Sequence, residues 1–271
     1  MIVSHFQGDW IRDPSEALVF PLDEEWQSRE EIKKLDQVTG GWLVDLLKLG
    51  EISSKPNKVT LLFSPPGLGT RVLVFAGVGK LSTNNASTYL KAASSAMRAL
   101  STKPRTTVRL AGFGASPLEV RAAITGAIQG SEGQDLFRSE KNIHAPDRIE
   151  WVGSNDSQVH AGEIIGKSVN LARNLVNQPP NLLYPESFAS KAMEIATQAG
   201  FFIEVWDKER LEQEQCGALL AVARGSVRDP RLLILRYQGS SPDSEPLALV
   251  GKGVTFDSGG YSLKPTDGML T

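Results

Sequence analysis

The sequence has little of what extracellular or membrane proteins require. Its 271 residues include a single cysteine, Cys216, so the chain cannot form an internal disulfide and does not depend on an oxidising compartment. No apolar run approaches the roughly 20 residues that span a bilayer. The N-terminal segment MIVSHFQGDW also lacks the basic and long apolar regions of a signal peptide. We therefore expect a cytoplasmic protein that does not associate with membranes.

An excess of charge of one sign is also absent. The 29 lysines and arginines are balanced by 31 aspartates and glutamates, which gives a formal net charge of −2. This balance argues against nucleic acid as a partner, because such binding depends mainly on neutralising phosphates with basic side chains. Hydrophobic residues make up 41% of the chain, enough to bury real cores, and the length suits one large or two ordinary domains.

Strand and helix patterns alternate over the first part of the chain. The spacing predicts strands at 17–22, 58–64, 71–79, 106–114 and 147–153, and helices at 28–50, 84–100 and 116–130. Ser116 and Pro117 are typical of a helix start, whereas Gly40 and Gly41 weaken the middle of the 28–50 helix. This alternation predicts an α/β domain over residues 1–155 with mainly parallel strands.

A second α/β domain is predicted over residues 156–271. Residues 156–178 favour a long helix that ends before the prolines at 179 and 180, and residues 184–200 favour another. Strand patterns come next at 201–206, 231–239 and 246–253, whereas 216–226 fits a helix or a strand. The continuous apolar run PLALV at 246–250 predicts that the strand at 246–253 is a central strand covered on both faces.

The adjoining segment, VGKGVTFDSGGYSLKP, carries Lys252, Asp257 and Lys264. Ligands of open α/β sheets bind beyond the carboxyl ends of the strands. A phosphate-binding loop is excluded because Gly253, not serine or threonine, comes after Lys252. Two interpretations remain open on the residues alone. In one, the carboxylate binds divalent ions together with a neutral lysine amine. In the other, Asp257 caps a turn and both lysines are solvated.

The same segment resembles the signature of the leucyl aminopeptidase (cytosol aminopeptidase) family of dinuclear metallo-aminopeptidases. The strings LARNLVNQPPNLLYPESFA, GALLAVARGS and PRLLILRYQG are similar to this family in the same order, so the resemblance covers roughly residues 160–271. The first half is similar in layout only. The resemblance implies an N-terminal macro-like α/β domain and then the first part of an α/β metallo-aminopeptidase catalytic domain.

The resemblance also implies roles for the three charged residues. Lys252 would be the amine ligand of one metal ion, Asp257 would bridge two divalent ions (Zn²⁺ or Mn²⁺), and Lys264 would polarise the scissile carbonyl. A metal-bound hydroxide would then remove N-terminal amino acids from peptide substrates. The family further implies a homohexamer for the full-length protein.

One departure from the family pattern limits this expectation. By the family's spacing, the remaining carboxylate ligands fall beyond Thr271, so we expect these 271 residues alone to be inactive. Two rival hypotheses remain. The macro-like domain could bind a nucleotide, ADP-ribose or nucleic acid through its glycine-rich turns PPGLGT and GFGAS, or the chain could be a degenerate, regulatory relative.

Overall fold

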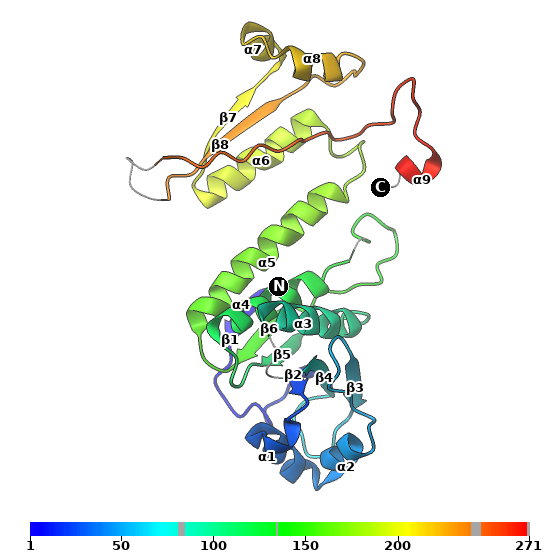
Figure 1. Cartoon of the computed structure of the whole chain (residues 1–271), viewed down its shortest axis with the longest axis vertical. Coiled ribbons are helices and arrows are strands. Elements are labelled where there is room, and N and C mark those ends of the chain that lie inside the picture. Colours follow the sequence, from blue (N-terminus) through cyan, green and yellow to red (C-terminus); the bar gives the residue numbers. More distant parts are fainter. Residues whose placement is uncertain (81–84, 134, 240–244, 270–271) are drawn as a thin grey trace. The chain divides into compact units, whose positions relative to one another are not determined.

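The chain forms two compact units, each with its own strands and helices. The computed structural model describes residues 1–80, 85–133, 135–239 and 245–269, and internal contacts divide the chain into Met1–Asn177 and Gln178–Thr271 (Figure 1), called unit 1 and unit 2. The predicted α/β class is confirmed, with a mainly parallel sheet in unit 1. Among the described residues, no helix has the length and apolar character needed to cross a bilayer.

Six strands of the described residues form the sheet of unit 1 in the order β1-β6-β5-β2-β4-β3. Every neighbouring pair is parallel except β3 with β4. The bounds are β1 Ile2–His5, β2 Ala17–Asp23, β3 Val59–Phe63, β4 Val72–Gly79, β5 Thr107–Ala111 and β6 Arg148–Val152. The strands predicted from sequence in this half are therefore present, and β1 is an additional strand.

Helices cover both faces of this sheet because the residues of β2 alternate between two cores. Ala17 and Val19 pack in the core that also contains α3 (Ala86–Leu100), α4 (Pro117–Gly130) and the start of α5 (Asp156–Val176). Leu18, Phe20 and Leu22 pack in the second core, with α1 (Glu30–Thr39) and α2 (Trp42–Lys48). This α/β/α layering results from the period of two along a strand.

Local signals account for most helix boundaries. Ser116 and Glu119 form a capping box at the start of α4, with Pro117 at its first position, and the Asn85 side chain accepts from the backbone of Thr88 at the start of α3. The single helix expected at 28–50 is instead two helices. Its break is at Gly40 and Gly41, whose φ angles of 66° and 90° suit glycine.

The long helix α5 belongs to unit 1 by its contacts. Its Gly162 and Gly166 face Ile124 and Ile128 of α4, so the two helices approach closely. The sequence predicts a domain boundary near residue 156, whereas the packed unit extends to Asn177. Close packing with α4 thus joins α5 to unit 1, although the resemblance in sequence groups most of this helix with the catalytic part of the chain.

A buried arginine ties the N-terminal loop to the sheet of unit 1. Arg109 on β5 is only 4% exposed, and its Nε donates to Glu150 Oε2 on β6 at 2.9 Å. Its two Nη atoms donate to the carbonyl oxygens of Asp13, at 2.7 Å, and Pro14, at 2.9 Å. The guanidinium also lies 3.9 Å from the ring centroid of Phe6. A single buried cation therefore satisfies two backbone carbonyls and a carboxylate.

Unit 2 is built around one helix and a small antiparallel sheet. Strands β7 (Phe202–Trp206) and β8 (Leu232–Arg236) pair with each other, and α6 (Pro185–Ala199) packs against them. Gly200 ends α6 in the left-handed conformation. The ambiguous run at 216–226 contains a helix, α8 (Gly217–Ala223), which comes after α7 (Lys208–Gln213). A short helix, α9 (Thr266–Met269), comes directly after the charged loop.

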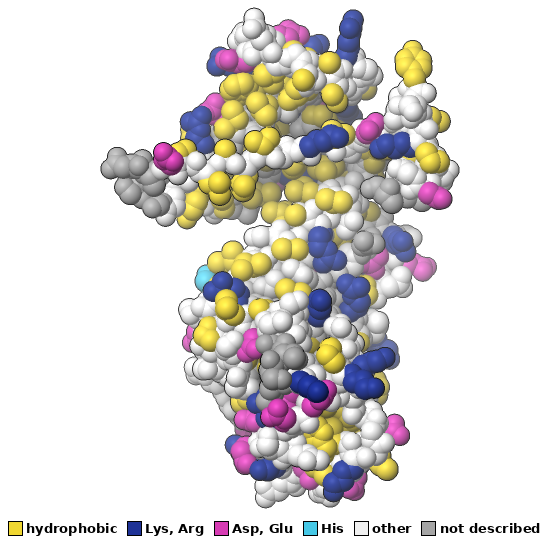
Figure 2. All heavy atoms as spheres, viewed as in Figure 1, with side chains coloured by type: hydrophobic (Ala, Val, Ile, Leu, Met, Phe, Trp, Pro, Cys, Tyr) yellow, Lys and Arg dark blue, Asp and Glu magenta, His cyan; other side chains and the backbone are white. Residues whose placement is uncertain are grey.

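The strand predicted at 246–253 is wrong for this structure. Those residues form no strand, and the side chains of Leu247, Leu249 and Val250 are 87%, 89% and 99% exposed. Figure 2 shows hydrophobic side chains gathered on the visible face of unit 2. A fully apolar strand is stable only when neighbouring strands and helices cover both faces. Within the described residues nothing provides that cover.

Candidate functional site

The three charged residues singled out from sequence lie on one loop that ends at α9. A tight turn shapes this loop, in which the Ser262 amide donates to the Gly259 carbonyl at 3.1 Å and the Lys264 amide donates to the Ser258 carbonyl at 2.9 Å. Gly259 has a φ of 91°, and a Cβ there would lie 2.2 Å from the Ser262 carbonyl oxygen. Only glycine fits this position, which explains the glycine in the middle of the motif.

The turn brings Asp257 and Lys264 together. Lys264 Nζ lies 3.4 Å from Asp257 Oδ2, and the two side chains are 40% and 56% exposed. The other carboxylate oxygen, Oδ1, accepts from the Gly259 amide at 2.8 Å. Each oxygen has a second lone pair, so the carboxylate still has room for further ligands. These two contacts therefore orient the Asp257 side chain and leave a lone pair on each carboxylate oxygen for other ligands.

The pKa of Asp257 is lowered below its usual value. The Gly259 amide is the main cause, then the positive charge of Lys264 and its hydrogen bond, and the charge of Lys252 adds to these. The carboxylate is therefore ionised at neutral pH and can bind a cation without first losing a proton. Because the group is exposed, water screens these interactions.

Lys252, the third residue of the predicted site, does not contact the other two. Its charge acts on Asp257, yet among the residues that the structure describes no hydrogen bond or ion pair joins the two side chains. As a metal ligand its amine would have to be neutral, and no buried pocket surrounds it because Lys252 is exposed. The loop thus brings the Lys264 side chain into contact with Asp257. Lys252 influences Asp257 through its charge without contacting it.

The donor set fits part of a metal centre. One ionised carboxylate is a suitable ligand for a divalent cation, and one lysine amine could join it. In the described part of the chain, no group of three or more histidine, cysteine, aspartate or glutamate side chains is placed to hold a metal ion. A dinuclear site would therefore require further carboxylates besides Asp257.

The glycine-rich turns of unit 1, which one rival hypothesis assigns to a ligand, contact backbone and side-chain groups of the protein itself. A Cβ on Gly69 would lie 2.1 Å from the Arg12 carbonyl oxygen, and the Gly69 amide donates to the Ile11 carbonyl. At the second turn, the Ser116 amide donates to the Glu119 carboxylate at 2.7 Å, in the place where an anion would bind at a helix start. These turns are therefore occupied by protein groups.

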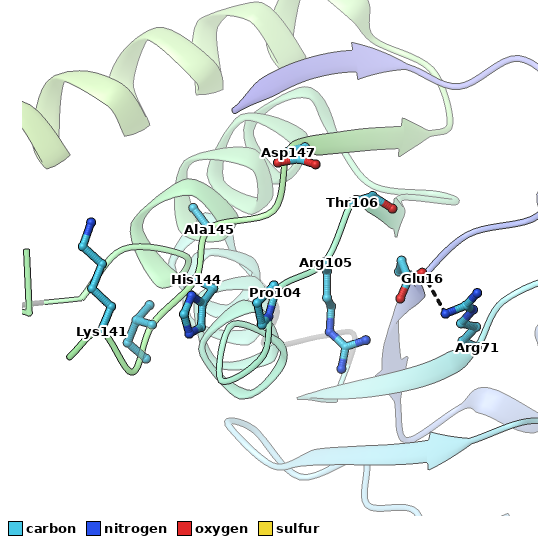
Figure 3. Close-up of a pocket in the computed structure, with 10 residues that line it drawn as sticks. Glu16, Arg71, Pro104, Arg105, Thr106, Lys141, His144, Ala145 and Asp147 are labelled. Atoms are coloured by element: carbon cyan, nitrogen blue, oxygen red, sulfur yellow. Dashed lines mark ion pairs between the residues drawn. The ribbon is translucent and has the colours of Figure 1, made fainter.

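A cavity in unit 1 was not foreseen from the sequence. It has a volume of about 570 Å³ and lies where β2, β4, β5 and β6 begin (Figure 3). Glu16, Arg71, Thr106 and Asp147 line it, and each directly precedes one of those strands. Residues that directly precede parallel strands lie together at the same end of the sheet. Polar residues at these positions could therefore have indicated a polar cavity from the sequence.

Two family models match the chain. The model described as "Cytosol aminopeptidase family, N-terminal domain" matches residues 18–141, and that described as "Cytosol aminopeptidase family, catalytic domain" matches residues 170–271. Relatives named "Probable cytosol aminopeptidase" include one from Rhodopirellula baltica, 42% identical over 82% of this chain and 43% of its own length. Another, from Bacillus subtilis, is 31% identical over 94% of this chain and 54% of its own. The chain thus spans about half the length of these relatives.

Solved structures share the fold. A mutant of tomato leucine aminopeptidase has a TM-score of 0.78 and 24% identity, over 94% of this chain and 55% of its own. The bottromycin maturation enzyme BotP in complex with Mn has a TM-score of 0.74 and 28% identity, over 93% of this chain and 51% of its own. Both likenesses extend over most of the chain and include parts of both units.

Proposed function

Because the chain belongs to the cytosol aminopeptidase family, we propose that it supplies Lys252, Asp257 and Lys264 to the site of a metal-dependent, leucyl-type aminopeptidase. The substrates are peptides, from which N-terminal amino acids are removed. The observation that carries this proposal is the Asp257–Lys264 pair, which the Gly259 turn holds at 3.4 Å inside the segment matched by the catalytic-domain model.

Each of the three side chains has a separate part in this proposal. Asp257 would hold divalent ions through its ionised oxygens, and the lowered pKa of this carboxyl supports that role. Lys252 would hold one ion through its amine. Lys264 donates a hydrogen bond to the carbonyl oxygen of the scissile peptide bond, so that negative charge developing there is stabilised. Lys264, which lies beside Asp257, is suitably placed for this donation.

The proposed cofactors are two divalent ions, Zn²⁺ or Mn²⁺. When bound, such ions would supply Lewis-acid polarisation of the carbonyl and activation of water. The Mn complex of BotP, a structural neighbour, supports the choice of a divalent metal. Asp257 and Lys252 are too few to hold two ions, so we expect no turnover from these 271 residues alone. The whole protein is proposed to be cytoplasmic and homohexameric.

The test joins this chain to the C-terminal half of the Rhodopirellula baltica relative and measures hydrolysis of leucyl p-nitroanilide. We expect turnover that depends on Mn²⁺ or Zn²⁺. Lys264→Met should lower kcat by about 10²–10³-fold, the range seen when one donor to a developing oxyanion is removed. A chimera that folds and binds metal but hydrolyses no leucyl substrate would contradict the proposed reaction.

Metal binding gives a second readout that does not need catalysis. Titration of the same chimera with Mn²⁺ should show weaker binding after Asp257→Asn, whereas Lys264→Met should keep its affinity. Asp267, an exposed carboxylate on α9, provides the matched control, because Asp267→Asn removes the same charge from a position outside the proposed ligands. Equal losses from Asp257→Asn and Asp267→Asn would refute the ligand assignment.

A further inference from the structure

We propose that the cavity at the amino-terminal ends of the unit 1 strands binds a small molecule that carries phosphate groups. The residues of this site belong to unit 1, and the proposal does not rest on the peptidase activity proposed above. Its volume of about 570 Å³ lies within the range of ordinary small-molecule sites. The walls come from four segments that the parallel strands bring to one edge, so the folded sheet itself builds the cavity.

The lining is more basic than the chain as a whole. It contains Arg71, Arg105 and Lys141 against Glu16 and Asp147, whereas the complete sequence has a net charge of −2. Arg71 is already paired with Glu16 at 3.2 Å, which Figure 3 marks with a dashed line. Arg105 and Lys141 have no carboxylate partner among the described residues. Two cationic side chains therefore remain unpaired in the lining, and Figure 3 shows their charged ends directed to different sides.

Arg105 is positioned by the end of α3. Its Nε donates to the Leu100 carbonyl at 3.1 Å, which leaves both Nη atoms without a hydrogen-bond partner in the described part of the chain. The next carbonyl, that of Ser101, accepts from the His144 amide at 2.7 Å. The negative end of the helix would otherwise repel an anion. Protein donors already satisfy these two carbonyls, and the Arg105 guanidinium adds a positive charge next to them.

A second segment of the lining is held in place by an aspartate. Asp135 Oδ2 accepts hydrogen bonds from the backbone amides of Asn142, at 2.5 Å, and Ile143, at 3.0 Å. The residues that flank this pair, Lys141 and His144, line the cavity. Figure 3 shows Lys141 and His144 on this strip and Arg105 on the segment before β5. The imidazole of His144 supplies a further ring nitrogen to the lining. The cavity thus has its basic side chains on two separate, anchored segments.

Phosphate fits this arrangement better than other ligands. A guanidinium with free Nη atoms forms two parallel hydrogen bonds to phosphate oxygens, and lysine adds a point charge. A nucleic-acid surface would instead need a basic stripe along the phosphate backbone, whereas here the cations line one hollow shared with Glu16 and Asp147. The carboxylates can accept from hydroxyl groups of the ligand. We therefore favour a small phosphorylated molecule.

The test is calorimetric titration of the 271-residue chain with pyrophosphate. We expect one saturable site, weakened at least about tenfold by Lys141→Met and by Arg105→Met, because hydrogen bonds to charged groups are strong. Lys141→Met changes no described contact, so it decides the question even if Arg105→Met destabilises α3. Arg98→Met provides the control, since Arg98 is exposed on α3 outside the lining, and it should stay within about twofold of the parent.

Several results would overturn the proposal. One is the absence of saturation at about 10 mM pyrophosphate, where even millimolar affinity would fill the site. Another is an equal loss of affinity in the Arg98→Met and Lys141→Met variants, which would indicate general charge attraction. A third is binding of duplex DNA that pyrophosphate does not displace and that depends on the same residues. That result would replace the small-molecule site with a nucleic-acid interface.

Discussion

Replacing Arg109 with methionine is expected to destabilise unit 1 more than any exposed charge substitution. Methionine keeps an unbranched apolar stem of similar shape but donates no hydrogen bond. The change leaves the Glu150 carboxylate, which is largely buried, without its partner and leaves the carbonyls of Asp13 and Pro14 without donors. The loop before β2 also loses its contact with the sheet through the Phe6 ring.

The magnitude is set by burial. The Arg109 and Glu150 side chains are only 5% and 16% exposed, so solvent does not replace the lost partner. Removing one member of a buried pair typically costs ~3–5 kcal/mol. Three separate hydrogen bonds to a charged group would add to ~4.5–9 kcal/mol if independent, but bonds from one guanidinium are not additive. We therefore expect a loss of ~3–5 kcal/mol in the free energy of unfolding.

Urea denaturation monitored by circular dichroism measures this loss, with a melting-temperature decrease of roughly 6–20 °C in parallel. Adding Glu150→Gln to the variant should restore about 1–2 kcal/mol, because the unpaired charge is removed. Lys33→Met is the control, since the Lys33–Glu30 pair is 55% and 69% exposed and its removal should leave the urea midpoint nearly unchanged. A loss below about 1 kcal/mol for Arg109→Met, well under the buried-pair range, would refute the reasoning.

Three further predictions concern other parts of the chain. Backbone amides lower the pKa of Asp135, so its stabilisation is present above the unfolded-state pKa and is lost as pH falls through the folded-state pKa. Asp135→Asn should therefore lower the urea midpoint at pH 7 and reduce its fall toward pH 3, and an unchanged slope would contradict this. Gly126→Ala should cost about 1–3 kcal/mol by urea titration, because a Cβ there would lie 2.1 Å from the Leu90 carbonyl oxygen. Leu249→Lys should change the free energy of unfolding by no more than about 0.5 kcal/mol in the same assay, since Leu249 is 89% exposed, and a larger loss would mean that it is packed in solution.

Most of the secondary structure of unit 1 could be predicted because its signals are local. The Ser116–Pro117 start of α4 depends only on neighbouring backbone groups, as does the Gly200 end of α6 in unit 2. The strand β1 could not be foreseen, since its four residues carry no alternating pattern and gain their hydrogen bonds only from β6. The apolar run around Leu249 predicted a strand that the described residues do not form, because a strand needs partners that its own sequence does not specify.

For function, the sequence by itself determined the family resemblance and the motif that contains Lys252, Asp257 and Lys264, because both are properties of residue order. Only the tertiary structure decided which of these side chains meet. The Gly259 turn brings Lys264 to Asp257, whereas Lys252 acts on Asp257 through charge alone. The tertiary structure alone also placed Arg105 and Lys141 around one cavity. Residues far apart in a chain become neighbours only through strand order and helix packing, which no local pattern encodes.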